Sequence, residues 1–456
     1  MKKHILFFVF AITISIQAQQ KLAFSFGETP QTLMLNPGAE TNFKQHYGIP
    51  ILSNFNLSIG NSGFKLADLF LDDSRDFNLK FQEVLSKIAP GDNISINAVI
   101  DVLNAGFRIN DKTYLSFGFY EELDIITYLP KDMLELFYYG NEPFLNRPFS
   151  ISQASMKADF LGVLHVGISR KINKKLTTGA RVKIYSSSLN VETSNNSGTF
   201  TTIIGTDNIL RQSLNNIDAQ LRTSGIVDSN NEVFDSPDEF LSKTFFGNNL
   251  GLGFDVGLTY HFSPQLEFTG SILDIGFIKH SNNIRNFSAK GDFILDGLNF
   301  EYNSDPTLDY WQELEDDFKD KVPTSETQEA YTSWRPMKIN AALKYSFGEQ
   351  RRVVCYGDTH KKYFNNSIGF QLHTIMRPLK AQFSFTSFYE KSLSKNAHFK
   401  FTHTINDYSP AIFGTGLSLQ LSRVHFFGML DNILALRDLS TANNISLNFG
   451  FNIVID

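Results

Sequence analysis

Hydrophobic and polar residues alternate almost strictly in four segments of the chain. In segments 250–262, 337–347, 379–389 and 445–455 nearly every second side chain is apolar or aromatic, and those between are small or polar. Successive side chains of a β-strand point to opposite faces. Each segment therefore predicts a strand with one apolar face and one polar face.

The lengths of these strands suit a membrane better than a soluble core. The four segments run for 11 to 13 residues, whereas globular strands average roughly 5–6 residues and a transmembrane strand needs about 9–11. Weaker alternation marks ten more segments of similar length and one shorter segment: 49–59, 94–109, 112–127, 152–170, 176–192, 265–279, 363–375, 395–406, 411–421 and 424–435, and the shorter 351–358. Because single-chain bacterial barrels have an even number of strands, we expect about 14 rather than all of these.

The connections between the predicted strands come in two sizes. The short ones are Asn110-Asp111, Ser263-Pro264, Gly348-Glu349 and Arg377, and the long ones are 60–93, 128–151, 193–249 and 280–336. Short turns at one rim and long loops at the other are typical of outer-membrane barrels, in which the short turns face the periplasm. We expect 280–336 to lie outside the barrel or to fold into its lumen.

The long insertions carry some predicted structure of their own. Helical spacing of apolar residues runs from Phe64 to Phe70, from Phe77 to Ile88 and from Asp305 to Lys321. Segment 193–249 is rich in Asn, Ser, Thr and Asp, which predicts an exposed loop with a short helix near 207–222.

These patterns predict an all-β protein: a transmembrane antiparallel up-and-down β-barrel of about 14 strands with short helical insertions. Hydrocarbon tolerates only helices or closed sheets, because every backbone polar group must be paired internally. The alternative is a periplasmic or secreted β-sandwich, in which the apolar faces would pack against each other. A sandwich would be soluble without detergent.

The first residues predict a targeting signal rather than part of the fold. Lys2 and Lys3 precede an apolar run from Ile5 to Ile16, and the small Ala18 suits cleavage by a signal peptidase. We therefore expect residues 1–18 to be a signal peptide and residues 19–456 to form one barrel domain in the outer membrane. The formal net charge of −6 gives no reason to expect nucleic acid as a partner. Outer-membrane lipid is the expected surrounding.

Three glycines on one strand predict a close approach inside the barrel. Gly251, Gly253 and Gly257 lie on the polar, inward face of segment 250–262. Their spacing is one residue too long for a dinucleotide fingerprint, and it lies within a strand rather than at a strand-to-helix turn. Glycine on an inner face leaves room for another segment. We predict that these residues contact a lumenal plug, formed by residues 19–47 or by an inserted helix.

Candidate chemistry is sparse. The single cysteine, Cys355, excludes an intramolecular disulfide and any multi-thiolate metal site. Histidines such as His373, His403 and His425 form no HxH or HExxH pattern, and the acidic run from Glu313 to Asp320 shares a helical pattern with lysines. We expect no catalytic residue, no metal site, no cofactor and no enzymatic activity. Six tyrosines near strand ends predict aromatic girdles at the two membrane interfaces: Tyr114, Tyr128, Tyr185, Tyr260, Tyr345 and Tyr389.

Several segments resemble a family beyond the general barrel pattern. They are 35–38, 48–50, 57–64, 165–168, 176–183, 270–278 and 430–434, which begin with Leu-Asn-Pro-Gly and end with Leu-Asp-Asn-Ile-Leu. Together they resemble a domain-of-unknown-function family of Bacteroidetes-type outer-membrane barrels. That family is similar to the FadL-like barrels and to the PorV and PorP/SprF proteins of type IX secretion and gliding systems. The resemblance implies a FadL-like barrel with an N-terminal segment in or near the lumen.

The resemblance leaves three functions open. The barrel passes or binds a hydrophobic small molecule, or it is a non-enzymatic accessory or docking subunit of a secretion or surface-assembly system, or it is a general diffusion porin. Gly-rich inner faces and apolar insertions indicate a filled lumen, which disfavours the porin. A continuous apolar track along the lumen would favour transport, and a sealed polar plug would favour docking.

Overall fold

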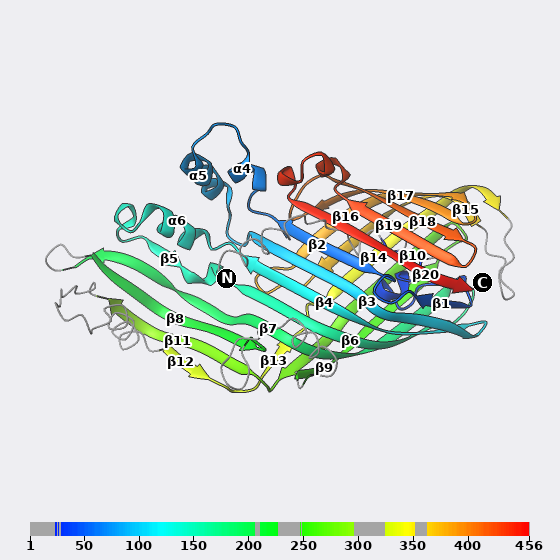
Figure 1. The fold of residues 1–456 in the computed structure, drawn as a ribbon, viewed down its shortest axis with the longest axis horizontal. Coiled ribbons are helices and arrows are strands. Elements are labelled where there is room, and N and C mark those ends of the chain that lie inside the picture. The colour runs from blue at the N-terminus through cyan, green and yellow to red at the C-terminus, as the bar shows by residue number, and fades with distance from the viewer. Residues whose placement is uncertain are drawn as a thin grey trace, which may run out of the picture.

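The computed structural model describes residues 23–24, 26, 29–205, 210–226, 247, 249–295, 324–351 and 363–455. Its main feature is a closed antiparallel β-barrel, in which the wall strands follow one another in the order of the chain (Figure 1). Strand β20 pairs with β19 on one side and with β1 and β2 on the other, which closes the ring. In ring order the fourteen wall positions are β1 (Gln45–Gly48) continued by β2 (Phe55–Asn61), β3 (Asn93–Asn110), β4 (Thr113–Tyr128), β6 (Met156–Lys171), β7 (Leu176–Ile204), β9 (Asn249–His261), β10 (Leu266–His280), β13 (Tyr331–Trp334) continued by β14 (Lys338–Arg351), β15 (Tyr363–Ile375), β16 (Gln382–Ser394), β17 (Ala397–Asn406), β18 (Ile412–Leu421), β19 (Val424–Asp431) and β20 (Asn444–Ile455).

The prediction of a 14-strand barrel is confirmed, and each wall position coincides with one predicted segment. The extra segment, 351–358, lies outside the described residues apart from Arg351, which ends β14. The predicted turn at Gly348-Glu349 is wrong, because β14 continues through it. Gly348 has a φ of 94° beside a register shift between Phe347 and Gln350. This glycine therefore marks a bulge in the strand rather than its end.

The two rims differ as predicted, with one exception. The turns after β3, β6, β9, β16 and β18 lie at the rim where the chain ends, and the long loops lie at the opposite rim (Figure 1). Arg377 connects β15 to β16 at the long-loop rim, not at the short-turn rim. The reason is that β14 runs toward the short-turn rim and β15 returns from it.

Helices occupy the long loops. The two helical predictions at 64–70 and 77–88 are confirmed by α4 (Leu66–Phe70) and α5 (Phe77–Lys87). The next loop carries α6 (Lys131–Tyr139), η1 (Glu142–Phe144) and η2 (Ile151–Gln153), and the last carries η4 (Ile433–Arg437) and η5 (Leu439–Thr441). The predicted helix from Asp305 to Lys321 lies outside the described residues.

The same sheet extends beyond the long-loop rim. Strand β7 is 29 residues long, and its outer half pairs with β5 (Pro148–Ser150) and β8 (Leu210–Ser224). Strands β11 (Ile284–Leu295) and β12 (Thr324–Thr327) follow β8 in order. The prediction of a loop and short helix within 193–249 is therefore wrong over 193–204 and 210–224, which form strands; residues 206–209 lie outside the described ranges. A break in the alternation at Asn216, which has a φ of 53°, obscured the strand pattern.

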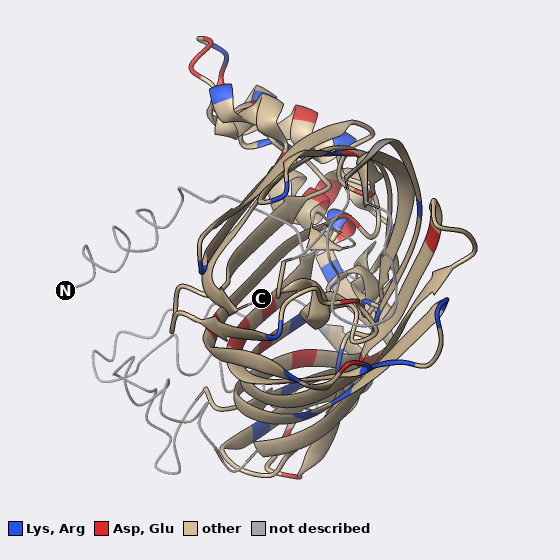
Figure 2. Cartoon of the chain, turned by 90° about the vertical axis from the view of Figure 1, so that its right-hand side faces the viewer, with Lys and Arg blue, Asp and Glu red and all other residues tan. Residues whose placement is uncertain are grey.

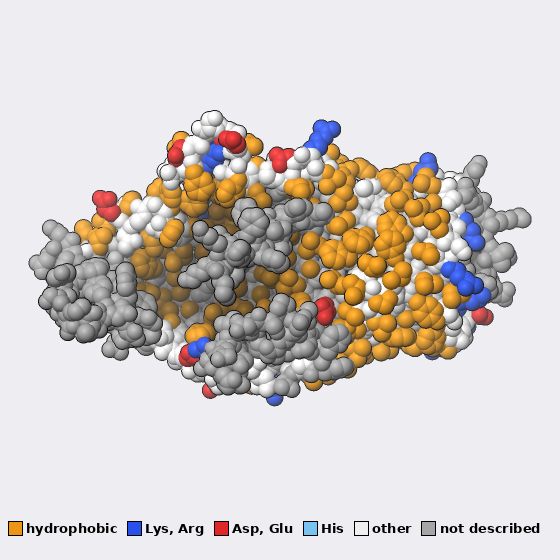
Figure 3. All heavy atoms as spheres, viewed as in Figure 1, with side chains coloured by type: hydrophobic (Ala, Val, Ile, Leu, Met, Phe, Trp, Pro, Cys, Tyr) orange, Lys and Arg blue, Asp and Glu red, His pale blue; other side chains and the backbone are white. Residues whose placement is uncertain are grey.

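Apolar side chains face outward and polar side chains face inward. Phe383 on the outer face is 62% exposed, whereas Lys400 and Asp255 on the inner face are fully buried. Orange apolar side chains accordingly gather over the barrel part of Figure 3. This inverted distribution is typical of a barrel whose outer face meets hydrocarbon. The alternative of a β-sandwich is wrong, because the strands close on themselves and their apolar faces are not packed against each other.

None of the helices in the described ranges is long and apolar enough to cross a membrane.

Candidate functional site

The described residues between 23 and 44, here called the N-terminal segment, lie inside the barrel (Figure 1). The helix α3 (Thr32–Leu35) in this segment ends with carbonyls that no helical turn can satisfy. The wall satisfies them instead. Arg181 of β7 donates to the carbonyl oxygens of Leu33 and Met34, the latter at 3.0 Å, and the Ser271 hydroxyl of β10 donates to that of Leu35 at 2.6 Å.

Below α3 the chain lies directly against glycines of the wall. A Cβ added at Gly257 would overlap the Asn36 side chain and lie 3.0 Å from Cδ of Pro37. A Cβ at Gly179 of β7 would overlap the backbone of Pro37. The Asn36 amide donates to the carbonyl of Leu258 at 3.1 Å. At these two wall positions only glycine leaves room for the N-terminal segment, for the Asn36 side chain at Gly257 and for the Pro37 backbone at Gly179.

The other two nominated glycines contact the wall itself. A Cβ at Gly253 would overlap Tyr185 of β7, and one at Gly251 would overlap Phe277 and lie against Ile278 of β10. Of the three residues nominated from sequence, the structure therefore brings only Gly257 next to the N-terminal segment. Residues 19–22 lie outside the described ranges. That residues 19–47 act as a plug stays a prediction.

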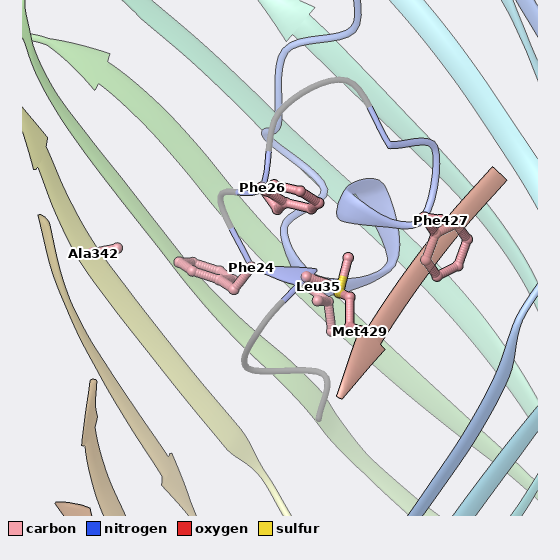
Figure 4. Close-up of a cluster of buried hydrophobic side chains, with 7 residues drawn as sticks. Phe24, Phe26, Leu35, Ala342, Phe427 and Met429 are labelled. Carbon is pink, nitrogen blue, oxygen red and sulfur yellow. The ribbon is translucent and has the colours of Figure 1, made fainter. Parts of the chain in front are cut away.

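Apolar packing and a buried lysine hold the start of the N-terminal segment. Phe24 and Phe26 belong to a buried cluster with Leu35 of the same segment and Phe427 and Met429 of β19 (Figure 4). The Lys400 ammonium of β17 lies over the Phe26 ring. It donates to the carbonyl of Phe24 at 3.0 Å and pairs with Glu390 at 3.2 Å.

A continuous network of ion pairs crosses the lumen beside α3. It begins at Arg181, which also holds the helix, passes through Arg335 in the break between β13 and β14, and ends at Asp159. Figure 2, which looks into the barrel from the rim where the chain ends, marks basic and acidic positions on the strands of the wall. Basic and acidic groups alternate along it, each separated from the next by 2.6 to 3.2 Å, in the order Arg181, Asp255, Lys183, Asp274, Lys338, Glu122, Arg335 and Asp159. Four positive and four negative charges balance, so the network offers no net charge to an ion.

A bulge in β10 places the centre of this network. The register of β10 on β9 shifts between Ile272 and Ile275, and Asp274 between them has a φ of 59°. Its peptide N–H donates to Asp255 at 2.7 Å, and its carboxylate accepts from Lys183 and from the Tyr185 hydroxyl. Aspartate tolerates this left-handed conformation better than most residues. The bulge thus turns the Asp274 carboxylate toward Lys183 of β7 and Lys338 of β14.

A second feature lies outside the barrel, on the loops of the long-loop rim. Seven aromatic rings, here called the aromatic row, follow one another with centroids 4.8 to 6.4 Å apart. They run from α4 through α5 and α6 to β5: Phe70, Phe77, Phe81, Tyr138, Tyr139, Phe144 and Phe149. Phe70 is 69% exposed and Phe149 is fully buried. The row therefore leads from solvent into the protein.

Arg147 lies over the inner end of the aromatic row. Its guanidinium carbon is 5.0 Å from the centroid of Phe144 and 4.6 Å from that of Phe149. Arg147 also pairs with Glu135 of α6 at 2.8 Å. Sequence reasoning missed the row because its rings come from two separate loops, and no local period connects them.

The prediction of aromatic girdles is wrong for three of the six tyrosines. Tyr345 is 43% exposed on the outer face, and Tyr260 stacks edge-on with the exposed Phe262 at 5.0 Å. Tyr114, Tyr128 and Tyr185 are instead buried on the inner face, which contradicts their place in a girdle. Each of the three lies at a position whose side chain points to the polar, inner face of its strand. Proximity to a strand end does not show which face a side chain occupies.

The histidines serve local polarity where the structure describes them. His373 bonds Asn340 at 2.8 Å, and His425 bonds Ser418 at 2.9 Å. Among the described residues, no group of three His, Cys, Asp or Glu side chains could hold a metal ion. The acidic run from Glu313 to Asp320 and Cys355 lie outside those residues.

The barrel and its sequence define a family. The model of a family of unknown function (DUF5723) matches residues 37–431, so the chain belongs to that family. No curated protein sequence matches the chain. The relation to PorV and PorP/SprF stays a prediction.

Solved structures similar to this chain are outer-membrane-type barrels of low identity. One is a FadL homologue of Pseudomonas aeruginosa, with 9% identity, a TM-score of 0.44 and coverage of 97% of this chain and 99% of that chain. Another is the toluene transporter TodX of Pseudomonas putida, with 9% identity, a TM-score of 0.37 and coverage of 96% and 97%. The monoaromatic hydrocarbon channel CymD gives 9% identity, a TM-score of 0.34 and coverage of 97% and 98%. At these values no ligand or activity carries over to this chain.

Proposed function

We propose that the protein is an outer-membrane β-barrel that binds a hydrophobic small molecule on its long-loop side, at the aromatic row. The outward-facing apolar belt supports the membrane location. The aromatic row carries the proposal of binding. Ring faces at 4.8 to 6.4 Å spacing offer stacking surface to a planar apolar molecule, and several of the rings are exposed to it.

Binding is better supported than passage through the lumen. A continuous apolar track would favour passage, but the ion-pair network lies across the lumen beside the N-terminal segment. Moving an apolar molecule past buried charges would separate them from their partners, at a cost of several kcal/mol for each uncompensated ion. Passage through the lumen would therefore require a rearrangement.

Fluorescence of an apolar naphthylamine probe, measured with the barrel in lipid nanodiscs, tests the proposal. We expect the double variant Phe77→Ala/Phe81→Ala to raise the dissociation constant about tenfold, since each aromatic contact contributes about 0.5–1.5 kcal/mol beyond its area. Phe262→Ala removes an exposed ring at the other rim and is the matched control. Equal loss in both variants, or no loss in either, would contradict binding at the aromatic row.

A second function is favoured by the polar contacts and ion pairs that cross the lumen: a docking subunit of a secretion or surface-assembly system. The sheet formed by β5, β8, β11 and β12 on the outer half of β7 offers a rigid external surface for it. Extraction from the native membrane in mild detergent, followed by mass spectrometry, separates the two functions. A stoichiometric protein with no apolar ligand would favour docking.

A further inference from the structure

Some ion pairs of the lumen join opposite walls of the barrel. Counted around the ring from β1/β2, strand β4 is third, β6 is fourth, β13/β14 is eighth, and Arg377 lies between the ninth and tenth positions. In a ring of fourteen, positions five to seven apart face each other. A side chain from the β13–β16 side that reaches β4 therefore crosses the lumen.

Two arginines make that crossing. Arg377 forms a two-pronged contact with Asp124 of β4, with Nη1–Oδ2 and Nη2–Oδ1 distances of 2.6 and 3.0 Å. Arg335 donates to Glu122 of β4 at 2.7 Å and to Asp159 of β6 at 3.1 Å. All five side chains are at most 5% exposed. Planar, paired contacts of this kind are the strongest that a guanidinium makes.

Hydrogen bonds between uncharged groups continue these contacts across the lumen as far as the long-loop rim. The Gln382 amide at the start of β16 donates to Asn93 at the start of β3, at 3.1 Å. Tyr408, in the loop between β17 and β18, shares a 2.7 Å hydrogen bond with Ser95 of β3. The peptide N–H of Leu379 donates to the Tyr128 hydroxyl at 3.3 Å. Both connections on this side thus fold across the barrel mouth onto β3 and β4.

This crossing is separate from the contacts that hold the N-terminal segment. Arg181, Ser271 and Lys400 bind carbonyls of that segment. Within the described ranges, Asp124, Arg377, Glu122, Arg335 and Asp159 make no hydrogen bond to it. They bond one another across the lumen and accept from side chains of neighbouring strands, Asn97 of β3 and Asn190 of β7. Glu122 also accepts from Lys338, which connects it to the ion pairs that lead to Arg181.

We propose that these five residues, the outer latch, form a gate at the outer end of the lumen that can open while the N-terminal segment stays in place. A buried ion pair is suited to this role. Its two charges need each other while water is excluded, and each can be solvated by water once the walls part. The latch is therefore held in two distinct states, dry and paired or hydrated and separated. The proposal does not depend on binding at the aromatic row.

Labelling of a buried cysteine tests the gate. Val163 of β6 is fully buried, pairs in register with Tyr120 and lies on the inner side of the outer latch. In a Cys355→Ser background, Val163→Cys is treated from outside with a membrane-impermeant thiol reagent, in the full-length protein in proteoliposomes. We expect Asp124→Asn/Arg377→Gln to raise the labelling rate about tenfold or more, because labelling follows the population of the open state. The external pair variant Arg285→Gln/Glu326→Gln is the matched control and should leave the rate unchanged.

Two further variants keep the result decisive. The charge exchange Asp124→Arg/Arg377→Asp restores an ion pair and should return the rate toward that of the parent protein. Arg377→Lys keeps the charge but loses the two-pronged contact, and should give an intermediate rate. Heat-modifiable migration on a gel checks that each barrel has folded. Folded latch variants that label no faster than the parent would overturn the gate, as would a parent protein that labels fast.

Discussion

The contacts at the two ends of the lumen are of different kinds. At the inner end, a neutral backbone segment is held by hydrogen bonds to its carbonyls and by glycines that leave room for it, as at Gly257 and Gly179. At the outer end, the walls hold each other through side-chain charges, as in the Arg377–Asp124 pair. The first closure depends on shape and the second on charge. Different substitutions should therefore release the two ends.

Arg181 is where the two closures meet, and its loss should have the largest effect. It pairs with Asp255 at 3.1 Å and holds the end of α3, at 1% exposure. Arg181→Ala should lower the free energy of unfolding by about 3–5 kcal/mol, because the buried Asp255 loses one of its two cationic partners and the carbonyls of α3 lose their donor. Urea denaturation of the refolded barrel measures this. Arg285→Ala breaks the external pair with Glu326 and should change little; an equal loss in both would contradict a special role for Arg181.

Gly257→Leu should release the inner end alone and at lower cost. Its side chain would occupy the place of Asn36 and Pro37. Overpacking of this kind costs about 1–3 kcal/mol, and here the N-terminal segment can move away. Limited proteolysis should then cut residues 23–44 while the barrel stays intact. In Gly270→Leu the added Cβ would meet only Phe268 at 3.4 Å and Asn340 at 3.7 Å, so that control should leave the segment protected. Equal protection in both variants would show that Gly257 does not seat the segment.

The sequence predicts the wall well because its signal is local. In segment 250–262 the polarity of each residue indicates which face of the strand its side chain occupies. The same alternation predicts every strand of the wall. It fails where a bulge shifts the parity, as at Asn216 in β8, and where a glycine bulge imitates a turn, as at Gly348. Both failures have the same cause. Side chains of a strand alternate between the two faces, so a single extra residue moves every later side chain to the opposite face.

The lumenal contacts could be predicted only in part. A small residue on an inner face signals that something approaches it, and Gly257 carried that signal. An ion pair such as Arg335–Glu122 joins residues 213 positions apart and depends on the register of every strand between them. Charges on the inner face are visible in the sequence, but their partners are set only when the ring closes.

The most direct test of two separate closures is the conductance of single barrels in a planar lipid bilayer. Four proteins are compared: the parent, Gly257→Leu, Asp124→Asn/Arg377→Gln, and the combination of all three substitutions. Two closures in series predict that the first three pass little current and that only the combined variant conducts steadily. A parent barrel that conducts, or full opening by either set of substitutions alone, would contradict the account.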